Sequence, residues 1–253
     1  MLLKTLIPAL MANTAAAHAH GHFHRQNVQS SSTIVPVPTP STSPIPNKPQ
    51  FGGVTPPSGT GVDYCGNRGD PYGSNILVID EQFVPDFNFV TQMTLPADTD
   101  ESWNVVVWNK CGTDGGINGF FGEWVQNFTI QPGETKYIAF DVDTQGGWGA
   151  APGSSPILDN SGSCASTWGE FDFNNTENAG HSGFDVSAIQ AQNAGLSVQG
   201  MSISAVGTDE SSSITNSGVV NNAYTASEAS NPSLGGHLDP GNVTLNCTLN
   251  YSG

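Results

Sequence analysis

The sequence has few basic residues and few charged residues of any kind. Lys and Arg together number 6, against 22 Asp and Glu, in a chain of 253 residues, so the formal net charge is −16 and charged residues make up 11%. A chain of this charge repels phosphate backbones and anionic lipid surfaces. Neither nucleic acid nor a membrane is therefore expected as a partner.

Long hydrophobic runs are also lacking. No later stretch approaches the roughly 20 apolar residues that a transmembrane helix needs. The N-terminus has Lys4, a short apolar run from Leu6 to Met11, and small residues at Ala15–Ala17. This pattern predicts a secretory signal peptide over residues 1–17. The C-terminal "TLNCTLNYSG" lacks the hydrophobic tail of a lipid-anchor signal. We expect a secreted protein of the medium or cell wall.

Cysteines are few, and none is spaced as C-x-x-C, which disfavours a metal site. The chain has 4 of them, and in an oxidising compartment an even number indicates two disulfides. Three connectivities are open. The same compartment makes N-glycosylation possible at the N-x-[ST] sequons, which are Asn127, Asn174, Asn242, Asn246 and Asn250.

Helix-forming segments are scarce, whereas turn formers are abundant, with 30 Gly and 17 Pro. Short apolar runs alternate with turns, which is typical of a β-sandwich or barrel. They include "NILVID", "WNVVVWN", "FFGEWVQNFTI", "TKYIAFDVD", "GEFDF", "LSVQGMSISAV" and "VTLNCTLNY". One short helix is predicted in "DVSAIQAQNA", with Ser187 as its cap. Before this all-β domain, assigned to residues 61–253, we expect a disordered His-rich and then Ser/Thr/Pro-rich linker over residues 18–60.

The stretch "TWGEFDF" (167–173) combines an aromatic ring with two carboxylates. Because side chains alternate along a strand, Phe171 and Phe173 should face the core, and Trp168, Glu170 and Asp172 the opposite side. A ring flanked by carboxylates suits a sugar, and the spacing permits two-carboxylate chemistry. A solvated strand face is the alternative.

Several stretches resemble the fungal Asp f 4-like allergen family. They are "PYGSNI", "WNKCGTDGGINGFFG", "PGETKYIAFDVDTQGGWGAA", "STWGEFDF" and "SGFDVSAIQAQNAGLSVQGMSI", and they extend over most of residues 61–230. The resemblance implies a secreted fungal protein bound by host IgE, and it implies no known reaction.

A more distant resemblance links "WNVVVWNKCG", "PGETKYIAFD", "GEFDF" and "FDVSAI" to the thaumatin-like proteins. It implies a thaumatin-like β-sandwich with long loops, in which Cys111 pairs with Cys247 and Cys65 with Cys164. It also implies an acidic cleft to which Glu170 and Asp185 contribute. Two positions depart from that cleft: Ala150 stands in place of its arginine and Gln190 in place of a further aspartate, so the resemblance favours glycan binding over hydrolysis.

Other candidate residues lie outside this pair. Trp148, flanked by glycines, is either an exposed sugar platform in a loop or a ring packed into the domain. His181 and His237 are isolated and expected in surface loops. No G-x-S-x-G nucleophile elbow occurs.

The N-terminal histidines form a separate candidate site. They recur at every second position, and imidazole suits Cu(II), Ni(II) and Zn(II). Adventitious metal binding is therefore one hypothesis for His18, His20, His22 and His24.

Together these features favour a secreted, non-catalytic allergen-like protein that binds cell-wall glycan. The glycan-binding candidates are Trp148, Trp168, Glu170, Asp172 and Asp185. A weak β-1,3-glucanase with Glu170 as acid and Asp185 as its partner is the alternative, and metal binding by the N-terminal histidines is a third. No other cofactor is expected.

Overall fold

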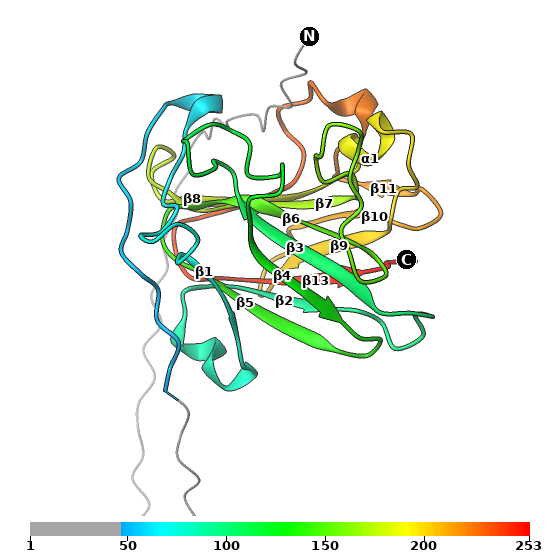
Figure 1. The fold of residues 1–253 in the computed structure, drawn as a ribbon, viewed down its shortest axis with the longest axis horizontal. Coiled ribbons are helices and arrows are strands. Elements are labelled where there is room, and N and C mark those ends of the chain that lie inside the picture. The colour runs from blue at the N-terminus through cyan, green and yellow to red at the C-terminus, as the bar shows by residue number, and fades with distance from the viewer. Residues whose placement is uncertain (1–46) are drawn as a thin grey trace, which may run out of the picture. The chain divides into compact units, whose positions relative to one another are not determined.

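The computed structural model describes residues 47–253, which form a β-sandwich of two stacked sheets (Figure 1). The all-β prediction is confirmed. The seven-stranded sheet contains, in spatial order, β1 (Ile76–Ile79), β5 (Thr135–Phe140), β2 (Phe89–Thr94), β13 (Val243–Leu249), β9 (Met201–Ala205), β10 (Ser211–Ile214) and β11 (Val220–Asn221). The six-stranded sheet contains β12 (Gly236–Leu238), β8 (His181–Ser187), β7 (Trp168–Asn175), β6 (Thr144–Pro152), β3 (Trp103–Asn109) and β4 (Trp124–Ile130).

Helical segments are short and lie between strands. They are η1 (Gly61–Asp63), η2 (Glu81–Asp86), α1 (Ile189–Asn193) and η3 (Ala226–Glu228). The predicted short helix exists as α1, but its cap was predicted wrongly. Ser187 belongs to β8, where it pairs with Trp168, and Ala188 precedes the helix. In the part of the chain described here, no helix is long and apolar enough to cross a membrane.

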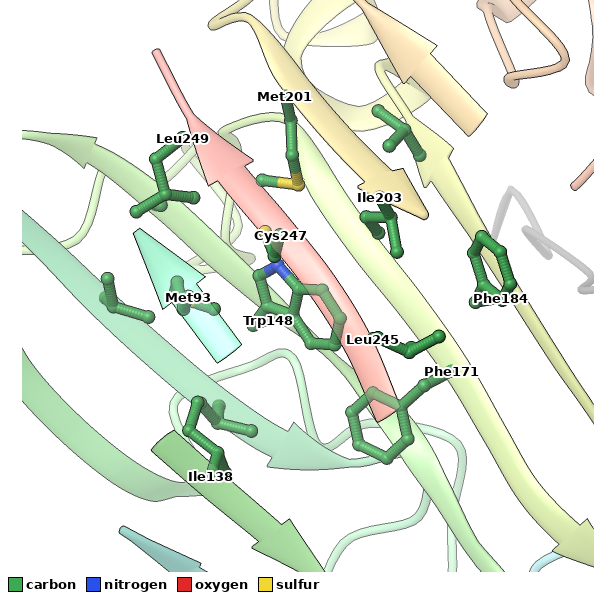
Figure 2. Packing of buried hydrophobic residues seen from close by; sticks show 14 of the residues in the cluster. Met93, Ile138, Trp148, Phe171, Phe184, Met201, Ile203, Leu245, Cys247 and Leu249 are labelled. Carbon is green, nitrogen blue, oxygen red and sulfur yellow. The ribbon is translucent and has the colours of Figure 1, made fainter. Parts of the chain in front are cut away.

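The core lies between the two sheets and follows the alternation of each strand. Phe171 and Phe173 are buried there, as the sequence predicts, against Phe140. Trp148 of β6 is 0% exposed and stacks on Phe171, with ring centroids 5.7 Å apart (Figure 2). The platform interpretation of Trp148 is therefore wrong, and the packed alternative is right.

The pattern of apolar runs does not reveal strand β6, because its sequence, "TQGGWGAAP", is glycine-rich, and glycine disfavours strands. The packing around β6 explains these glycines. A Cβ at Gly147 would lie 2.9 Å from the Trp108 ring, and one at Gly149 would lie 2.4 Å from the Cys164 sulfur. Glycine is required at both positions because the Trp108 ring and the Cys164 side chain occupy the space that a Cβ atom would need.

The predicted disulfides are wrong. Cys65 is bonded to Cys111, while Cys164 and Cys247 are free and buried. Cys247 lies on β13 and points into the core beside Trp148 (Figure 2), whereas Cys111 follows β3 at the end of the other sheet. Cys164 lies on the outer side of the six-stranded sheet, against Trp168. The free thiols are thus separated by a sheet.

Thiol chemistry should reflect this arrangement. Burial raises the pKa of the Cys247 thiol to about 12 and also raises the pKa of Cys164. Since the thiolate is the reactive form, neither cysteine should be alkylated in the native protein. Unfolding without reductant should expose both Cys164 and Cys247, and a further two thiols should appear only after reduction. Peptide mapping that found Cys111 joined to Cys247 would contradict the fold.

Candidate acid–aromatic site

The sequence candidates Glu170 and Asp185 are brought together on the outer face of the six-stranded sheet. Glu170 of β7 is directly opposite Asp185 of β8 and, on its other side, opposite Gly147 of β6. Gly147 in turn is opposite Trp108 of β3, which is opposite Trp124 of β4. These residues form one row perpendicular to the strands, from Trp124 on β4 to Asp185 on β8, across five adjacent strands.

Glu170 and Asp185 form a hydrogen-bonded carboxyl pair. Burial raises the pKa of Glu170 to about 7, and it raises the pKa of Asp185 well above its ordinary range, with the Glu170 charge adding to the effect. Asp185 is 6% exposed, and its Oδ1 has no hydrogen-bond partner among the described residues. The pair therefore holds at least one proton near neutral pH, because two negative charges on directly opposite residues of neighbouring strands repel each other.

A loop that follows β11 covers Asp185. A Cβ at Gly235 would lie 2.9 Å from Cβ of Asp185, and the Asn222 side chain donates to the Gly235 carbonyl. Tyr224 lies beside the pair, where burial and then the charges of Asp185 and Glu170 raise its pKa to about 12. Access to the acid pair is thus on the side of Glu170, which is only partly buried.

Asp172 lies on the same face, two residues along β7. Its two carboxylate oxygens accept hydrogen bonds from Gln145 (3.1 Å) and Asn175 (2.6 Å). Burial nevertheless raises the pKa of Asp172 to about 6. Asp172 is thus held by neighbouring amides, and Glu170 is the carboxyl of "TWGEFDF" that is better placed to bind a ligand.

Lys110 is the cation of this face, and the sequence analysis missed it. Burial lowers the pKa of Lys110, while the charges of Asp172, Asp63, Glu177 and Glu170 oppose that shift. Alternation along β3 could have placed Lys110 on this face, because Lys110 follows Val106 and Trp108 at intervals of two.

The comparison of Ala150 with a cleft arginine does not hold, because Ala150 is buried on the core side of β6, opposite Val105.

The aromatic part of the site differs from the prediction. Trp168 faces outward, as expected, but it is buried, and its Nε1 donates to the Cys164 carbonyl at 3.0 Å. It packs against Trp108 and Phe120. The rings that reach solvent are Trp124, Phe120 and Phe121, of which Phe121 is 46% exposed. We call the surface formed by Phe121, Trp124, Glu170 and Asp185 the acid–aromatic face.

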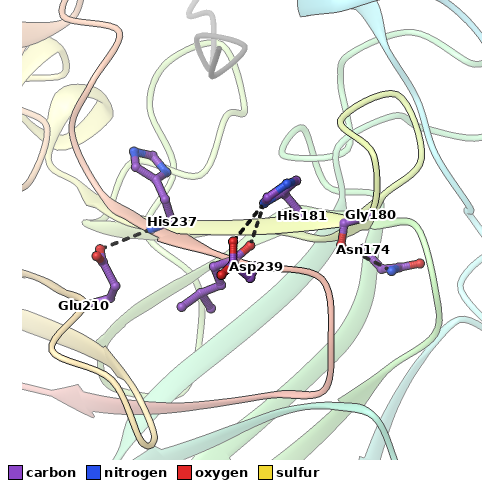
Figure 3. Close-up of polar contacts among 7 residues, drawn as sticks. Asn174, Gly180, His181, Glu210, His237 and Asp239 are labelled. Atoms are coloured by element: carbon purple, nitrogen blue, oxygen red, sulfur yellow. Dashed lines mark hydrogen bonds and ion pairs between the residues drawn. The ribbon is translucent and has the colours of Figure 1, made fainter. Parts of the chain in front are cut away.

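His181 and His237 were expected in loops, but they lie on neighbouring strands β8 and β12 (Figure 3). The Nδ1 atom of His181 is 3.2 Å from the Leu238 carbonyl and 3.8 Å from Asp239. Glu210 accepts a hydrogen bond from the backbone of His237. These contacts join the edge of the six-stranded sheet to its neighbouring loops.

No group of three or more His, Cys, Asp or Glu within residues 47–253 is arranged to hold a metal ion. The candidate ligands His18, His20, His22 and His24 lie outside the described residues. Among the sequons, Asn127, Asn242 and Asn246 are exposed, whereas Asn174 and Asn250 are partly buried and hydrogen-bonded. Glycosylation at these sites stays a prediction.

The fold and this face define a class: a β-sandwich protein with an acid pair and a partly exposed aromatic cluster on one sheet. The model of the Allergen Asp f 4-like domain matches residues 74–249. "Allergen Asp f 4" from Aspergillus fumigatus is 46% identical over 203 residues, which are 79% of this chain and 62% of that protein. The chain belongs to the Asp f 4-like allergen family, and it spans less than two thirds of the length of this relative.

Proposed function

We propose that this chain is a secreted, non-catalytic allergen-like protein that binds cell-wall β-glucan through the acid–aromatic face. The observation that carries the proposal is the transverse row from Trp124 to Asp185. Strands lie about 4.8 Å apart, so Trp124 and Glu170 are separated by about 14 Å, the length of a short oligosaccharide. A ring can stack on the C–H face of a sugar while a carboxyl group binds its hydroxyls.

Geometry supports binding over hydrolysis. Two-carboxylate glycosidases keep their carboxyl groups about 5 Å or more apart, so that a sugar or a water fits between them. Glu170 and Asp185 are instead in direct hydrogen-bond contact. Because burial raises the pKa of both groups, that of Glu170 to about 7, the carboxyls are mostly protonated below neutral pH and are then poor nucleophiles or bases. Glu170 remains the strongest acid candidate for the alternative β-1,3-glucanase.

Sedimentation with insoluble β-1,3-glucan tests the proposal. The wild type should bind, Glu170→Gln should bind roughly tenfold more weakly because a hydrogen bond to an ionisable group is lost, and Phe121→Ala should also weaken binding. Glu101→Gln makes the same chemical change at an exposed position and should bind like the wild type. Failure of the wild type to bind would contradict the proposal.

Reducing ends released in the same assay separate binding from catalysis. We expect none from the wild type. Release that disappears in Glu170→Gln would make the protein an enzyme and identify its acid.

Recognition by IgE is proposed from family membership, since the relative is named an allergen. Serum from patients sensitised to that relative should bind this chain in an immunoassay, and soluble relative should compete. Absence of any cross-reaction would restrict the allergen role to the relative.

A further inference from the structure

The outer face of the seven-stranded sheet carries two regular rows of uncharged polar side chains. Each row takes one residue from each of five adjacent strands, in the order β10, β9, β13, β2 and β5. One row is Ser213, Ser202, Thr248, Thr94 and Thr135. The other is Ser211, Ser204, Asn246, Gln92 and Tyr137. We call these side chains together the hydroxyl face.

The hydroxyl face is accessible to a ligand. The alternate residues of the same strands, such as Ile203, Cys247 and Met93, fill the core (Figure 2). The row members point the other way, and all of them are partly or fully exposed, Asn246 most clearly. Within the rows, the hydroxyls of Thr94 and Thr135 are 2.8 Å apart. On one side the rows end at Tyr137, which packs against an apolar cluster formed by Ile79 and Phe83.

Charge restricts what this face can bind. All row members are uncharged, although the chain as a whole carries a net charge of −16. The row members themselves carry no charge to attract an ionic partner, and the carboxyl group of Glu81 meets the rows only at their Tyr137 end. The rows offer hydrogen-bond donors and acceptors at every position. Neutral ligands rich in hydroxyl groups match it best.

Spacing restricts the ligand further. Neighbouring strands are about 4.8 Å apart, so each row presents a polar group at that interval along a line of about 19 Å. This interval is close to the rise of one sugar in an extended β-1,4-linked polysaccharide. A single chain lying across the strands would therefore meet one polar side chain from each row per sugar, and Tyr137 would give an aromatic contact at one end.

We propose that the hydroxyl face is a docking surface for an extended, neutral β-1,4-linked polysaccharide that lies across strands β10 to β5. The site is independent of the acid–aromatic face, which lies on the other sheet. Since sheets twist by roughly 20–25° per strand, single chains in an amorphous polymer fit better than the flat surface of a crystal.

The test removes two hydroxyls without changing side-chain shape. Thr94→Val with Thr248→Val keeps the β-branched form that strands favour, so the protein should fold. Asn246 starts a sequon that includes Thr248, and a glycan there would cover the rows. The protein is therefore made in a bacterial host that adds no N-glycans.

Affinity is measured by depletion on amorphous chitin and amorphous cellulose. The wild type should bind at least one of them, and the double variant should bind about tenfold more weakly, as two lost hydrogen bonds predict. Thr129→Val, on edge strand β4 of the other sheet, should bind like the wild type. Glu170→Gln is measured beside it to separate this binding from any binding at the acid–aromatic face.

Three outcomes would overturn the proposal. They are no binding to either polymer, equal binding by the double variant, and binding lost only in Glu170→Gln. The last would place all glycan binding on the acid–aromatic face. Sedimentation velocity adds a check, because dimerisation abolished by the double variant would assign the hydroxyl face to a second copy of the chain.

Discussion

Replacing Trp148 by alanine should lower the free energy of unfolding by about 3–5 kcal/mol, the range for a large aromatic residue truncated in a packed core. Trp148 is fully buried between the sheets, where its ring contacts Phe171 and lies beside Cys247 (Figure 2). The backbone below cannot collapse into the cavity, because β6 is paired on both sides. Urea unfolding followed by circular dichroism measures the loss.

Trp124→Ala is the matched control for this change. Trp124 is partly buried on edge strand β4, and it contacts Trp108 with ring centroids 5.6 Å apart. Its truncation should cost clearly less than that of Trp148. Equal losses, or a loss below about 2 kcal/mol for Trp148→Ala, would contradict the burial of Trp148. Gly169→Ala should also destabilise the fold, since its Cβ would lie 2.3 Å from the Trp148 ring.

Replacing Asp185 by asparagine should stabilise the protein at pH 7.5 and leave its stability at pH 4.5 nearly unchanged. Folding raises the pKa of both carboxyls of the Glu170–Asp185 pair, so the folded state binds more protons than the unfolded state between their ordinary values near 4 and the raised values. The stabilisation from Glu170 is therefore complete below about pH 4 and is lost as pH rises through about 7, and the stabilisation from Asp185 is also lost as pH rises above its ordinary pKa. Asparagine imitates the protonated acid and removes one charge from the pair.

Thermal unfolding at pH 4.5, 6.0 and 7.5 tests whether the stability of the protein falls as pH rises. The wild type should lose stability across the series, with Asp172 adding to the slope because its pKa is also raised, to about 6. Asp185→Asn should show a flatter slope. Asp98→Asn, at an exposed position, should run parallel to the wild type. A wild-type curve that rises with pH would mean that the pair is ionised in the folded protein and that the site is misread.

Alternation along a strand was the most dependable guide in the sequence. It correctly placed Phe171 and Phe173 in the core and Glu170 on the opposite face, because a period of two is a local property of extended backbone. Alternation gives no information where a segment is not recognised as a strand. In "QGGWGA" the glycines weaken the strand signal, and so Trp148 was left with two interpretations, an exposed platform in a loop or a packed ring.

The long-range features could not be obtained in this way. The Cys65–Cys111 bond depends on where the segment before β1 meets the end of β3, and no spacing along the chain reveals that position. The sequence by itself determined the all-β class, the alternating faces and the scarcity of positive charge. Only the tertiary structure decided the disulfide, the burial of Trp148 and Trp168, the acids that surround Lys110 and the alignment of polar rows across five strands. These depend on which strands become neighbours, and pairing between distant segments is set by packing of the whole sandwich.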